Sequence, residues 1–393
     1  MKTSSKHLSI FMAFMLLLSI LPFGAGLAQN ASGGMTFESV TNANDMGSVT
    51  YPQLTGYALE DVQNTINQDI YTKSEIASHL EILADLDQGG WGLQVTYTGA
   101  IEKDVLSVLI SAIGEMPSGQ FGQTYTTVNY NLSAGTPIAV SDLFTDEESA
   151  FAFMEQQLED NLRPELSGYL ENDGLSPIPR DNFFLTPYSI TFYYPQDQFS
   201  MISGYSGGCT FYYYELKDYL RLDAGSPLAL LGVGDTLSIT GNTAALTKQT
   251  VEEGVLPGIP ARLGDSLISI LDEYRLLVDP DYYPGGRFFE LEAPEFRNAW
   301  LLTDDLTESY DQSLVLGIRA DRINLYGIQP GVTTKDEWRM VLGTPNQTVA
   351  LDESTASDYR LPAGESDYYT FGANTLRLCA DESGLLASVH ILR

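Results

Sequence analysis

The stretch 183–220 carries the strongest structural signal in the chain. Its two runs of aromatic and β-branched residues, 183–194 and 210–214, are typical of strands. A short amphipathic tail, 215–220, follows the second run. Turn-forming residues separate the two runs, namely Pro195, Gly204, Gly207 and Gly208. We therefore expect a strand pair and a closing segment of the first domain.

Helical and strand-like periodicities alternate along the chain. Apolar residues four apart, Val62, Ile66 and Ile70, predict an amphipathic helix over 58–70. Alternating apolar residues from Leu93 onward predict antiparallel strands. The other predicted helices cover 75–86, 147–162, 263–278 and a short segment after 334; the strand-like runs cover 93–97, 105–109, 125–132, 228–240, 287–291, 298–303, 313–319, 368–371, 375–380 and 385–392. This pattern predicts an α+β protein with antiparallel sheets and packed helices in two regions.

The short helix after residue 334 has signals at both ends. A capping box would form at its start from Thr333 with Asp336, or from Thr334 with Glu337. Gly343 predicts its end, since glycine adopts the conformation that stops a helix.

The N-terminus has the pattern of an export signal. Lys2 and Lys6 precede an apolar segment, 8–21, that is shorter than a membrane span. Small residues ending at Ala28 predict cleavage there. We therefore predict a signal peptide over 1–28, a polar and flexible lead-in over 29–48, and a secreted, extracellular protein associated with the cell surface.

The length of 393 residues exceeds that of one ordinary domain. The segment 247–260 contains two prolines and two glycines and is the best candidate for a linker. It would separate an α+β domain, 49–246, from a helix-plus-antiparallel-sheet region, 261–393. Within that region RFFEL parallels DYYTF, and NAWLLTD parallels NTLRLCAD. A degenerate tandem repeat over 261–326 and 327–393 would explain this, and so would chance alternation of apolar residues.

The chain is strongly acidic, with 52 Asp and Glu residues against 20 Lys and Arg and a formal net charge of −32. This composition excludes a basic nucleic-acid-binding surface. It favours a basic partner or a divalent cation that long-range attraction would draw in. Solubility outside the cell is the simpler explanation of the same charge.

No motif predicts catalysis. The patterns H-E-x-x-H and the P-loop are missing from the sequence. His79 and His390 are expected to be packing or surface residues. The acidic loops lack the spacing of a calcium loop, and zinc chemistry lacks ligands. Acids are so common that a glycosidase-like pair carries no information. We therefore predict no catalytic residue, no cofactor and no metal.

Cys209 and Cys379 are the only two cysteines. Each lies in a strand-like run, where a small buried hydrophobe fits. The alternative is one long-range disulfide between them in an oxidising compartment.

Three segments resemble one extracytoplasmic domain family: YPQLTGYALEDVQNTIN from Tyr51, VNYNLSAGTPIAVSDL from Val128, and the stretch 183–220. The family occurs in RsiV-type anti-sigma factors, which sense lysozyme, in PdaC-type peptidoglycan deacetylases, and in other Gram-positive surface proteins. The similarity covers 51–222, but the usual glycine–histidine turn appears as Gly119-Gln120-Phe121-Gly122. The sequence contains neither a sigma-binding segment nor a deacetylase catalytic domain. The resemblance therefore implies an α+β extracellular domain that can bind protein beside the cell wall.

The segments GVTTKDEW, 331–338, and LGTP, 342–345, resemble a second signature. It belongs to small β-lactamase-inhibitor-like and outer-membrane-assembly-lipoprotein-like domains. The signature is mainly structural, and it implies a helix-plus-antiparallel-sheet fold with a tendency to bind other molecules.

Tyr205, Tyr212 and Tyr214 are the candidate binding residues, because tyrosine offers a large contact area with a polar tip. In a strand, Tyr212 and Tyr214 would point to one side and Phe211 and Tyr213 to the other. One pair would then belong to the core, so core packing with incidental surface exposure is the favoured interpretation.

These observations predict a secreted, non-enzymatic protein that binds a basic extracellular protein such as lysozyme, or peptidoglycan, at the cell surface. A wall-acting hydrolase with unidentified acidic residues is one alternative. An accessory or sensory subunit of a surface complex is another.

Overall fold

The computed structural model describes residues 34–86, 92–116, 121–161, 176–195, 207–271, 281–283, 285–291, 299–304 and 313–393. It confirms the predicted α+β class. Contacts within the chain define two compact units. The first comprises 1–186, 192–203 and 223–231; the second comprises 187–191, 204–222 and 232–393.

The first unit is built on a six-stranded sheet with strands in sequence order. Its strands are β1 (Thr36–Asn44), β2 (Gly47–Thr55), β3 (Leu93–Glu102), β4 (Val105–Glu115), β5 (Phe121–Asn131) and β6 (Thr136–Pro137). The prediction of purely antiparallel sheets was wrong at β2 and β3, which pair in parallel. The chain between them passes through helices α2 (Glu60–Lys73) and α3 (Ile76–Asp85), and such a crossover allows parallel pairing.

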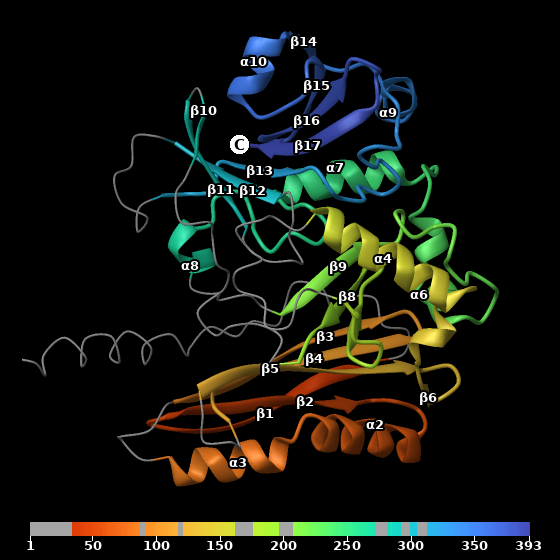
Figure 1. Ribbon diagram of the computed structural model, residues 1–393, viewed down its shortest axis with the longest axis vertical. Coiled ribbons are helices and arrows are strands. Elements are labelled where there is room, and N and C mark those ends of the chain that lie inside the picture. The colour runs from red at the N-terminus through yellow and green to blue at the C-terminus, as the bar shows by residue number, and fades with distance from the viewer. Residues whose placement is uncertain are drawn as a thin grey trace, which may run out of the picture. The chain divides into compact units, whose positions relative to one another are not determined.

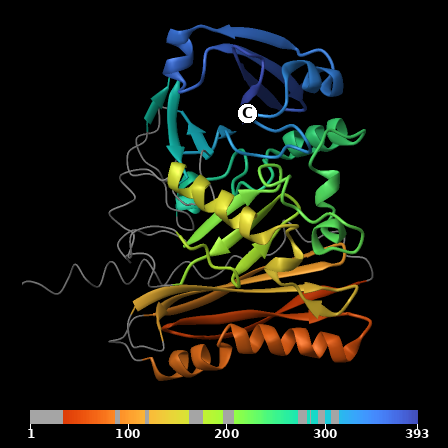
Figure 2. The same cartoon turned by 45° about the vertical axis from the view of Figure 1, so that its right-hand side comes forward.

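Helices α2 and α3 run along one face of this sheet (Figure 2). Ile66 and Ile70 of α2 and Leu83 of α3 are buried with Val49 of β2 and Val95 of β3 in one apolar cluster. Each such side chain stabilises the fold by about 1.5–3 kcal/mol. The four-residue spacing in α2 that predicted a helix is the spacing that brings these residues to one face.

The other face of the same sheet presents buried polar side chains. Ser107 Oγ donates to Asn129 Oδ1 (2.6 Å), and Asn129 Nδ2 donates to the Phe183 carbonyl (2.6 Å). The Leu185 amide donates to Ser107 Oγ (3.0 Å). These bonds attach β7 (Phe183–Leu185) to the sheet. Asn129, one of the residues that carry the family resemblance, is therefore a structural residue.

Beyond helix α4 (Glu147–Asn161), the aromatic stretch forms the third sheet, with order β7-β8-β9. Strand β8 spans Ser189–Tyr193 and β9 spans Gly208–Tyr212. Both runs form strands as predicted, but the run 183–194 is divided into β7 and β8, so three strands replace the expected pair. The division between the two units falls within β8.

The strand predicted over 228–240 was wrong. The segment contains helix α6 (Pro227–Leu231) and a 3₁₀ turn, η3 (Val233–Asp235). Pro227 favours a helix start because its missing N–H needs no partner there. Gly232, with φ of 83°, then reverses the chain direction between the two helical pieces. In this segment the proline and the glycine determine the local structure, and the β-propensity of the apolar residues does not.

Two further expectations on domain limits need correction. The lead-in 29–48 contains β1, which pairs with β2 over its whole length. The first part of the expected linker 247–260 lies in helix α7 (Thr243–Glu253), which ends at Gly254. Glycine and proline in this segment therefore mark the end of a helix, and the helix belongs to the second unit.

The second unit contains an eight-stranded antiparallel sheet with order β10-β11-β12-β13-β17-β16-β15-β14 (Figure 1). The strands are β10 (Asp281–Tyr283), β11 (Gly286–Glu290), β12 (Ala299–Thr303), β13 (Gly317–Ala320), β14 (Gln347–Leu351), β15 (Gly364–Phe371), β16 (Asn374–Asp381) and β17 (Leu386–Leu392). This order is symmetric about the β13–β17 pair. Four strands follow α8 (Leu267–Leu271), and four follow α9 (Lys335–Leu342), with α10 (Glu353–Asp358) inserted in the second set.

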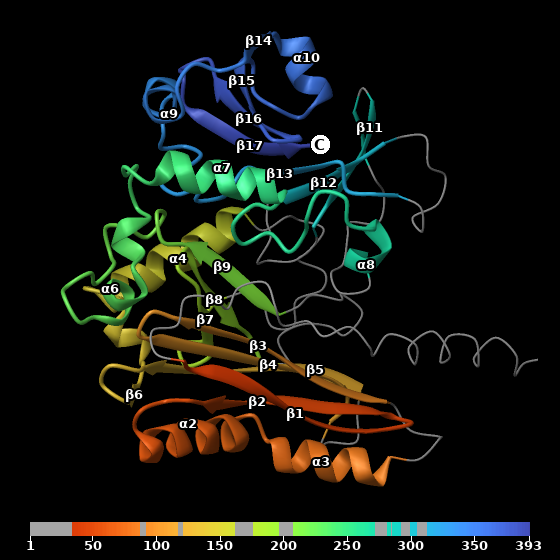
Figure 3. The ribbon, with the colours of Figure 1, turned by 180° about the vertical axis from the view of Figure 1, so that it is seen from behind.

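One face of the eight-stranded sheet forms the core of the second unit. Leu301, Ile318, Leu378 and Ile391 from four strands are buried with Trp338 of α9. Helices α7 and α9 lie beside this sheet (Figure 3). The expected helix over 263–278 is confirmed for α8; residues 272–278 lie outside the described residues.

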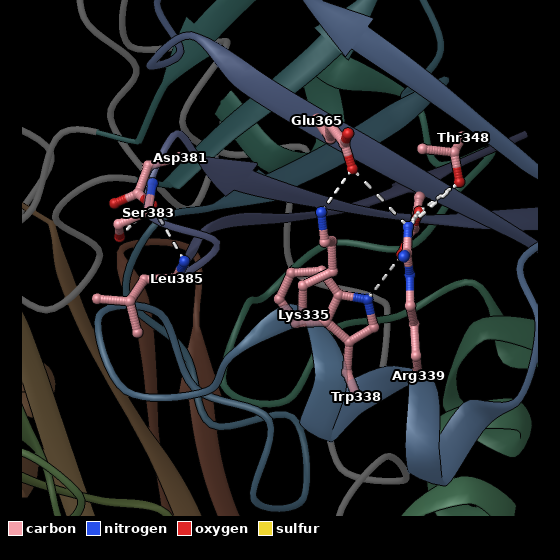
Figure 4. Close-up of polar contacts among 9 residues, drawn as sticks. Lys335, Trp338, Arg339, Thr348, Glu365, Asp381, Ser383 and Leu385 are labelled. Atoms are coloured by element: carbon pink, nitrogen blue, oxygen red, sulfur yellow. Dashed lines mark hydrogen bonds and ion pairs between the residues drawn. The ribbon is translucent and has the colours of Figure 1, made fainter.

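A buried carboxylate anchors α9 to the sheet (Figure 4). Asp367 of β15 accepts bonds from Arg339 (2.7 Å to each oxygen), Trp338 Nε1 (3.0 Å) and Thr348 Oγ1 (2.7 Å). Burial alone would raise the pKa of Asp367, but these hydrogen bonds hold the pKa below its ordinary value. Asp367 is therefore an ionised residue of the core.

Candidate functional site

The other face of the eight-stranded sheet contains a pocket with a volume of 360 Å³. Side chains alternate along a strand, so the neighbours of the core residues point to this side. The described lining residues include three arginines and five aromatic residues, and none is Asp or Glu. They are Tyr283, Phe288, Trp300, Leu302, Leu316, Arg319, Tyr359, Tyr368, Arg377, His390, Leu392 and Arg393.

The floor of the pocket is one row of cross-strand neighbours. Each residue pairs directly with the next across adjacent antiparallel strands, at the short separation that such pairs have. The row runs from β12 to β15 and consists of Trp300, Arg319, His390, Arg377 and Tyr368. Residues from distant parts of the sequence therefore meet through strand register alone.

Arg319 is a fully engaged cation. It donates to both oxygens of Asp321 (2.9 and 2.6 Å) and to the carbonyls of Tyr359 (2.7 Å) and Arg360 (2.9 Å). Its guanidinium also lies 4.2 Å from the centre of a Trp300 ring. The charge of Arg319 is thus balanced by Asp321, and its role is structural.

Arg377 differs from Arg319 in lacking a counter-ion. Its side chain is only 6% exposed, and its Nε donates to Ser366 Oγ (3.1 Å). The guanidinium lies 5.5 Å from the ring centres of both Tyr359 and Tyr368. Among the described residues no carboxylate contacts it. Arg377 is therefore a buried cation whose charge is supported by aromatic rings alone.

His390 lies between the two arginines and is 2% exposed. Its Nε2 is hydrogen-bonded with Ser388 Oγ (2.8 Å), and its buried Nδ1 has no partner in the described part of the chain. Burial, with the charges of Arg377 and Arg319, holds the pKa of His390 well below its ordinary value. The imidazole is neutral at physiological pH.

Aromatic rings form the walls of the pocket. The rings of Tyr283 and Phe288 are stacked with centres 5.8 Å apart, and Tyr359 lies 6.0 Å from Tyr283. Phe288, Trp300 and Leu302 pack together as one apolar cluster. A cationic floor with flat apolar walls can hold an anion attached to a flat apolar body.

Tyr212 and Tyr214, the candidate binding residues, are only 6% and 7% exposed, which agrees with the favoured interpretation of core packing. All five residues of β9 are buried, so both faces of this strand are covered and Tyr212 lies in the core. They pack near the ion pair of Glu215 with Arg322 (2.7 Å). Burial raises the pKa of Tyr212 to about 12. Tyr205 lies outside the described residues.

Cys209 and Cys379 are both buried and are not joined to each other, so the alternative of a disulfide is not realised. Cys379 packs with Leu351, Ala356 and Leu361 of the second unit. Its Sγ accepts a hydrogen bond from Ser366 Oγ (3.3 Å). Cys379 therefore packs as a small buried hydrophobic residue, which is what its strand-like sequence context predicted.

Sequence reasoning missed every residue of the pocket. A usable signal was present in two strand-like runs, where a single arginine interrupts apolar residues: LGIRA around Arg319 and LRLCA around Arg377. A charged residue at a buried strand position needs a partner or a function. That signal identifies the arginines, but it does not show that they lie in one row of the sheet.

Two other properties concern only the described residues. No group of three or more His, Cys, Asp and Glu side chains is placed to hold a metal ion there. In the same residues, no helix has the length and apolar character needed to span a membrane.

The fold is thus that of a two-unit α+β protein with a pocketed antiparallel sheet. No family model matches the chain, and no curated protein is similar to it in sequence. It is similar to a solved DUF3298 family protein from Bacteroides fragilis NCTC 9343, with 14% identity and a TM-score of 0.37. That match covers 51% of this chain and 98% of the other. A DUF3298 family protein from Pseudomonas aeruginosa PAO1 matches with 11% identity and a TM-score of 0.35, over 48% of this chain and 94% of the other.

Proposed function

We propose that this chain is a secreted, non-enzymatic binding protein of the cell surface and that the pocket of the eight-stranded sheet holds its ligand. The observation that carries the proposal is Arg377, a buried cation that contacts no carboxylate among the described residues. Such a group costs stability unless a partner compensates it, and binding sites are where proteins keep groups of this kind.

The proposal also assigns the two regions of the chain. The segment 51–222, which contains the three resembling segments, would belong to an RsiV/PdaC-type extracytoplasmic domain. Residues 261–326 and 327–393 would be tandem helix-plus-sheet repeats, which the symmetric strand order supports. The export-type N-terminus supports secretion.

Of the two expected partners, peptidoglycan fits the pocket better than a basic protein does. The lining has arginines and no described acidic residue, so a cationic group would meet like charge. The net charge of −32 would repel an anion at long range. That repulsion is screened over about 8–10 Å at physiological salt, whereas contacts inside the pocket are screened much less.

Retention on purified peptidoglycan tests this function, with the mature protein and two tryptophan variants. Leu302→Trp would fill the pocket, because Leu302 lies in its lining. Met340→Trp is the matched control, since Met340 is 83% exposed and lies outside the lining. We expect retention of the wild type and of Met340→Trp, and loss of Leu302→Trp at an unchanged melting temperature.

Three results would contradict the proposal. If the wild type does not bind above background, peptidoglycan is not the ligand. If folded Leu302→Trp is retained equally well, the pocket is not the binding site. Release of soluble fragments from peptidoglycan would favour the hydrolase alternative. Immobilised lysozyme serves as a separate arm, where salt-sensitive retention would indicate a partner bound by surface charge.

A further inference from the structure

We propose that the pocket recognises a single carboxylate carried on a ring, with the carboxylate on the Nη groups of Arg377 and a face of the ring against the aromatic walls. This inference rests on the proposed function for the pocket's role as the ligand site and adds the chemical class of the ligand.

The donors of Arg377 indicate an anion. A guanidinium has five N–H donors, and within the described part of the chain Arg377 uses Nε alone toward a protein acceptor, Ser366 Oγ. Tyr359 and Tyr368 flank the guanidinium with their rings, and they fix its plane. The two Nη groups are left to form the parallel pair of hydrogen bonds that a carboxylate accepts.

The charges on the floor indicate one negative charge on the ligand. Asp321 balances Arg319, His390 is neutral, and Arg377 remains as the one uncompensated cation of the row. Arg393, the third arginine of the lining, is exposed, so solvent and salt screen its charge. A carboxylate would neutralise it, whereas a doubly charged phosphate would leave an excess charge in a buried site.

His390 lies beside Arg377 in the row and does not compensate its charge. Its ring is neutral, because burial and the two neighbouring arginines lower its pKa. Its Nδ1 is buried from solvent and has no partner in the described residues, so a ligand in the pocket does not reach that nitrogen.

The walls and the size of the pocket indicate a ring. Tyr283, Phe288 and Tyr359 present flat apolar surfaces above the cationic floor. The volume of 360 Å³ lies at the small end of ligand sites, which span about 300–1,000 Å³. It accommodates one substituted ring and excludes a longer oligomer from the floor.

Matched acid and neutral ligands test the inference by calorimetric titration. N-acetylmuramic acid and N-acetylglucosamine differ by the carboxylate-bearing lactyl group, and benzoate and benzamide form the aromatic pair. We expect the acid of at least one pair to bind about tenfold or more tightly than its neutral partner. The preferred pair identifies the ring as a sugar or an aromatic acid.

Arg377→Met should abolish the preference for the acid, and Arg262→Met should keep it, because Arg262 is exposed and outside the lining. Equal binding of acid and neutral ligands, or an undiminished preference in Arg377→Met, would overturn the inference. Thermal unfolding gives a second readout. Removing an unpaired buried cation should raise the melting temperature of the free protein; a fall would assign Arg377 a structural role.

The two proposals fail in different ways. If peptidoglycan is retained through the pocket but no acid is preferred, the carboxylate site is wrong and the wall-binding function stands. If ring carboxylates bind through Arg377 but peptidoglycan is not retained, the site stands and the function is wrong.

Discussion

At the scale of single residues, the buried titratable groups show how the environment decides protonation. His79 of α3 is 4% exposed, and His390 of β17 is 2% exposed. Burial lowers the pKa of His79, and burial with two neighbouring arginines lowers the pKa of His390 further. Both were expected to be packing or surface residues, and both are packing residues.

These lowered pKa values predict acid sensitivity. The unfolded chain binds a proton at each histidine below about pH 6.5, whereas the folded chain resists it. Each buried neutral histidine therefore contributes to the free energy of unfolding above its unfolded pKa. This contribution is lost as the pH falls toward its folded pKa. For His390 the loss should approach about 1.4 kcal/mol per pH unit.

Urea unfolding of wild type and His390→Gln at about pH 7 and pH 5.5 measures this loss. The free energy of unfolding of the wild type should drop more between the two pH values. His79→Gln provides the comparison for the other histidine. Parallel declines in wild type and His390→Gln would show that His390 does not resist protonation.

Asp367 and Glu365 are neighbours on β15 that both contact α9, but their burial differs. Asp367 is 1% exposed and binds Arg339, whereas the Glu365 side chain is 43% exposed and binds Lys335. Asp367→Asn should cost about 1.5–3 kcal/mol, because it weakens charge-assisted hydrogen bonds to a buried carboxylate, while Arg339, 32% exposed, stays partly solvated. Glu365→Gln should cost less than about 1 kcal/mol. Chemical denaturation compares them, and similar costs would contradict the anchoring role of Asp367.

At the scale of elements, the end signals of the short helix were informative. The capping box of α9 is formed by Thr334 and Glu337, one of the two predicted pairs. The Glu337 carboxylate accepts from the Thr334 amide (2.8 Å) and hydroxyl (2.7 Å). Thr333 turns inward, accepts from the Gln329 amide and is buried. The local sequence pattern is compatible with either capping pair. The burial of Thr333 leaves Thr334 and Glu337 as the pair that forms.

The loop before α9 contains two glycines with positive φ that differ in their surroundings. Gly327 has φ of 95°, and a Cβ there would lie 2.4 Å from the backbone of Ser238. Gly331 has φ of 73°, and no atom lies within 4 Å of the equivalent Cβ. The first position needs glycine for space and conformation, and the second needs it for conformation alone.

Gly331→Ala should therefore cost about 1–2 kcal/mol, the strain of the left-handed region. Gly327→Ala should cost clearly more. Its Cβ would overlap the 238–239 backbone, and displacing that backbone should add about 1–3 kcal/mol or more. Melting temperatures of the two variants give the comparison. Equal losses would mean that close packing at Ser238 does not constrain Gly327.

At the scale of the whole molecule, the net charge of −32 sets the response to salt. Like charges repel in the compact state, and salt screens them within a Debye length of about 10 Å at 0.1 M. The melting temperature should rise as sodium chloride increases from about 0.02 to 0.5 M. Tetramethylammonium chloride should give a similar rise if screening is the cause. A constant or falling melting temperature would show that acidic repulsion does not limit stability.

The sequence by itself determined the α+β class and most of the individual elements. Period-two runs gave β3, β4, β5 and β8, and four-residue spacing gave α2. These patterns are readable because backbone hydrogen bonding and one-sided burial act between residues close in the sequence. The pattern failed over 228–240, where a proline and a glycine outweighed apolar content.

Only the tertiary structure decided the pocket. Its floor joins Trp300, Arg319, His390, Arg377 and Tyr368 through the register of five strands. A shift of one residue in any of these pairings would turn a side chain from the pocket to the core. The burial of Tyr212 and Tyr214 has the same origin. Register and burial at strand ends are set by packing between residues far apart in the sequence, which local periodicity does not encode.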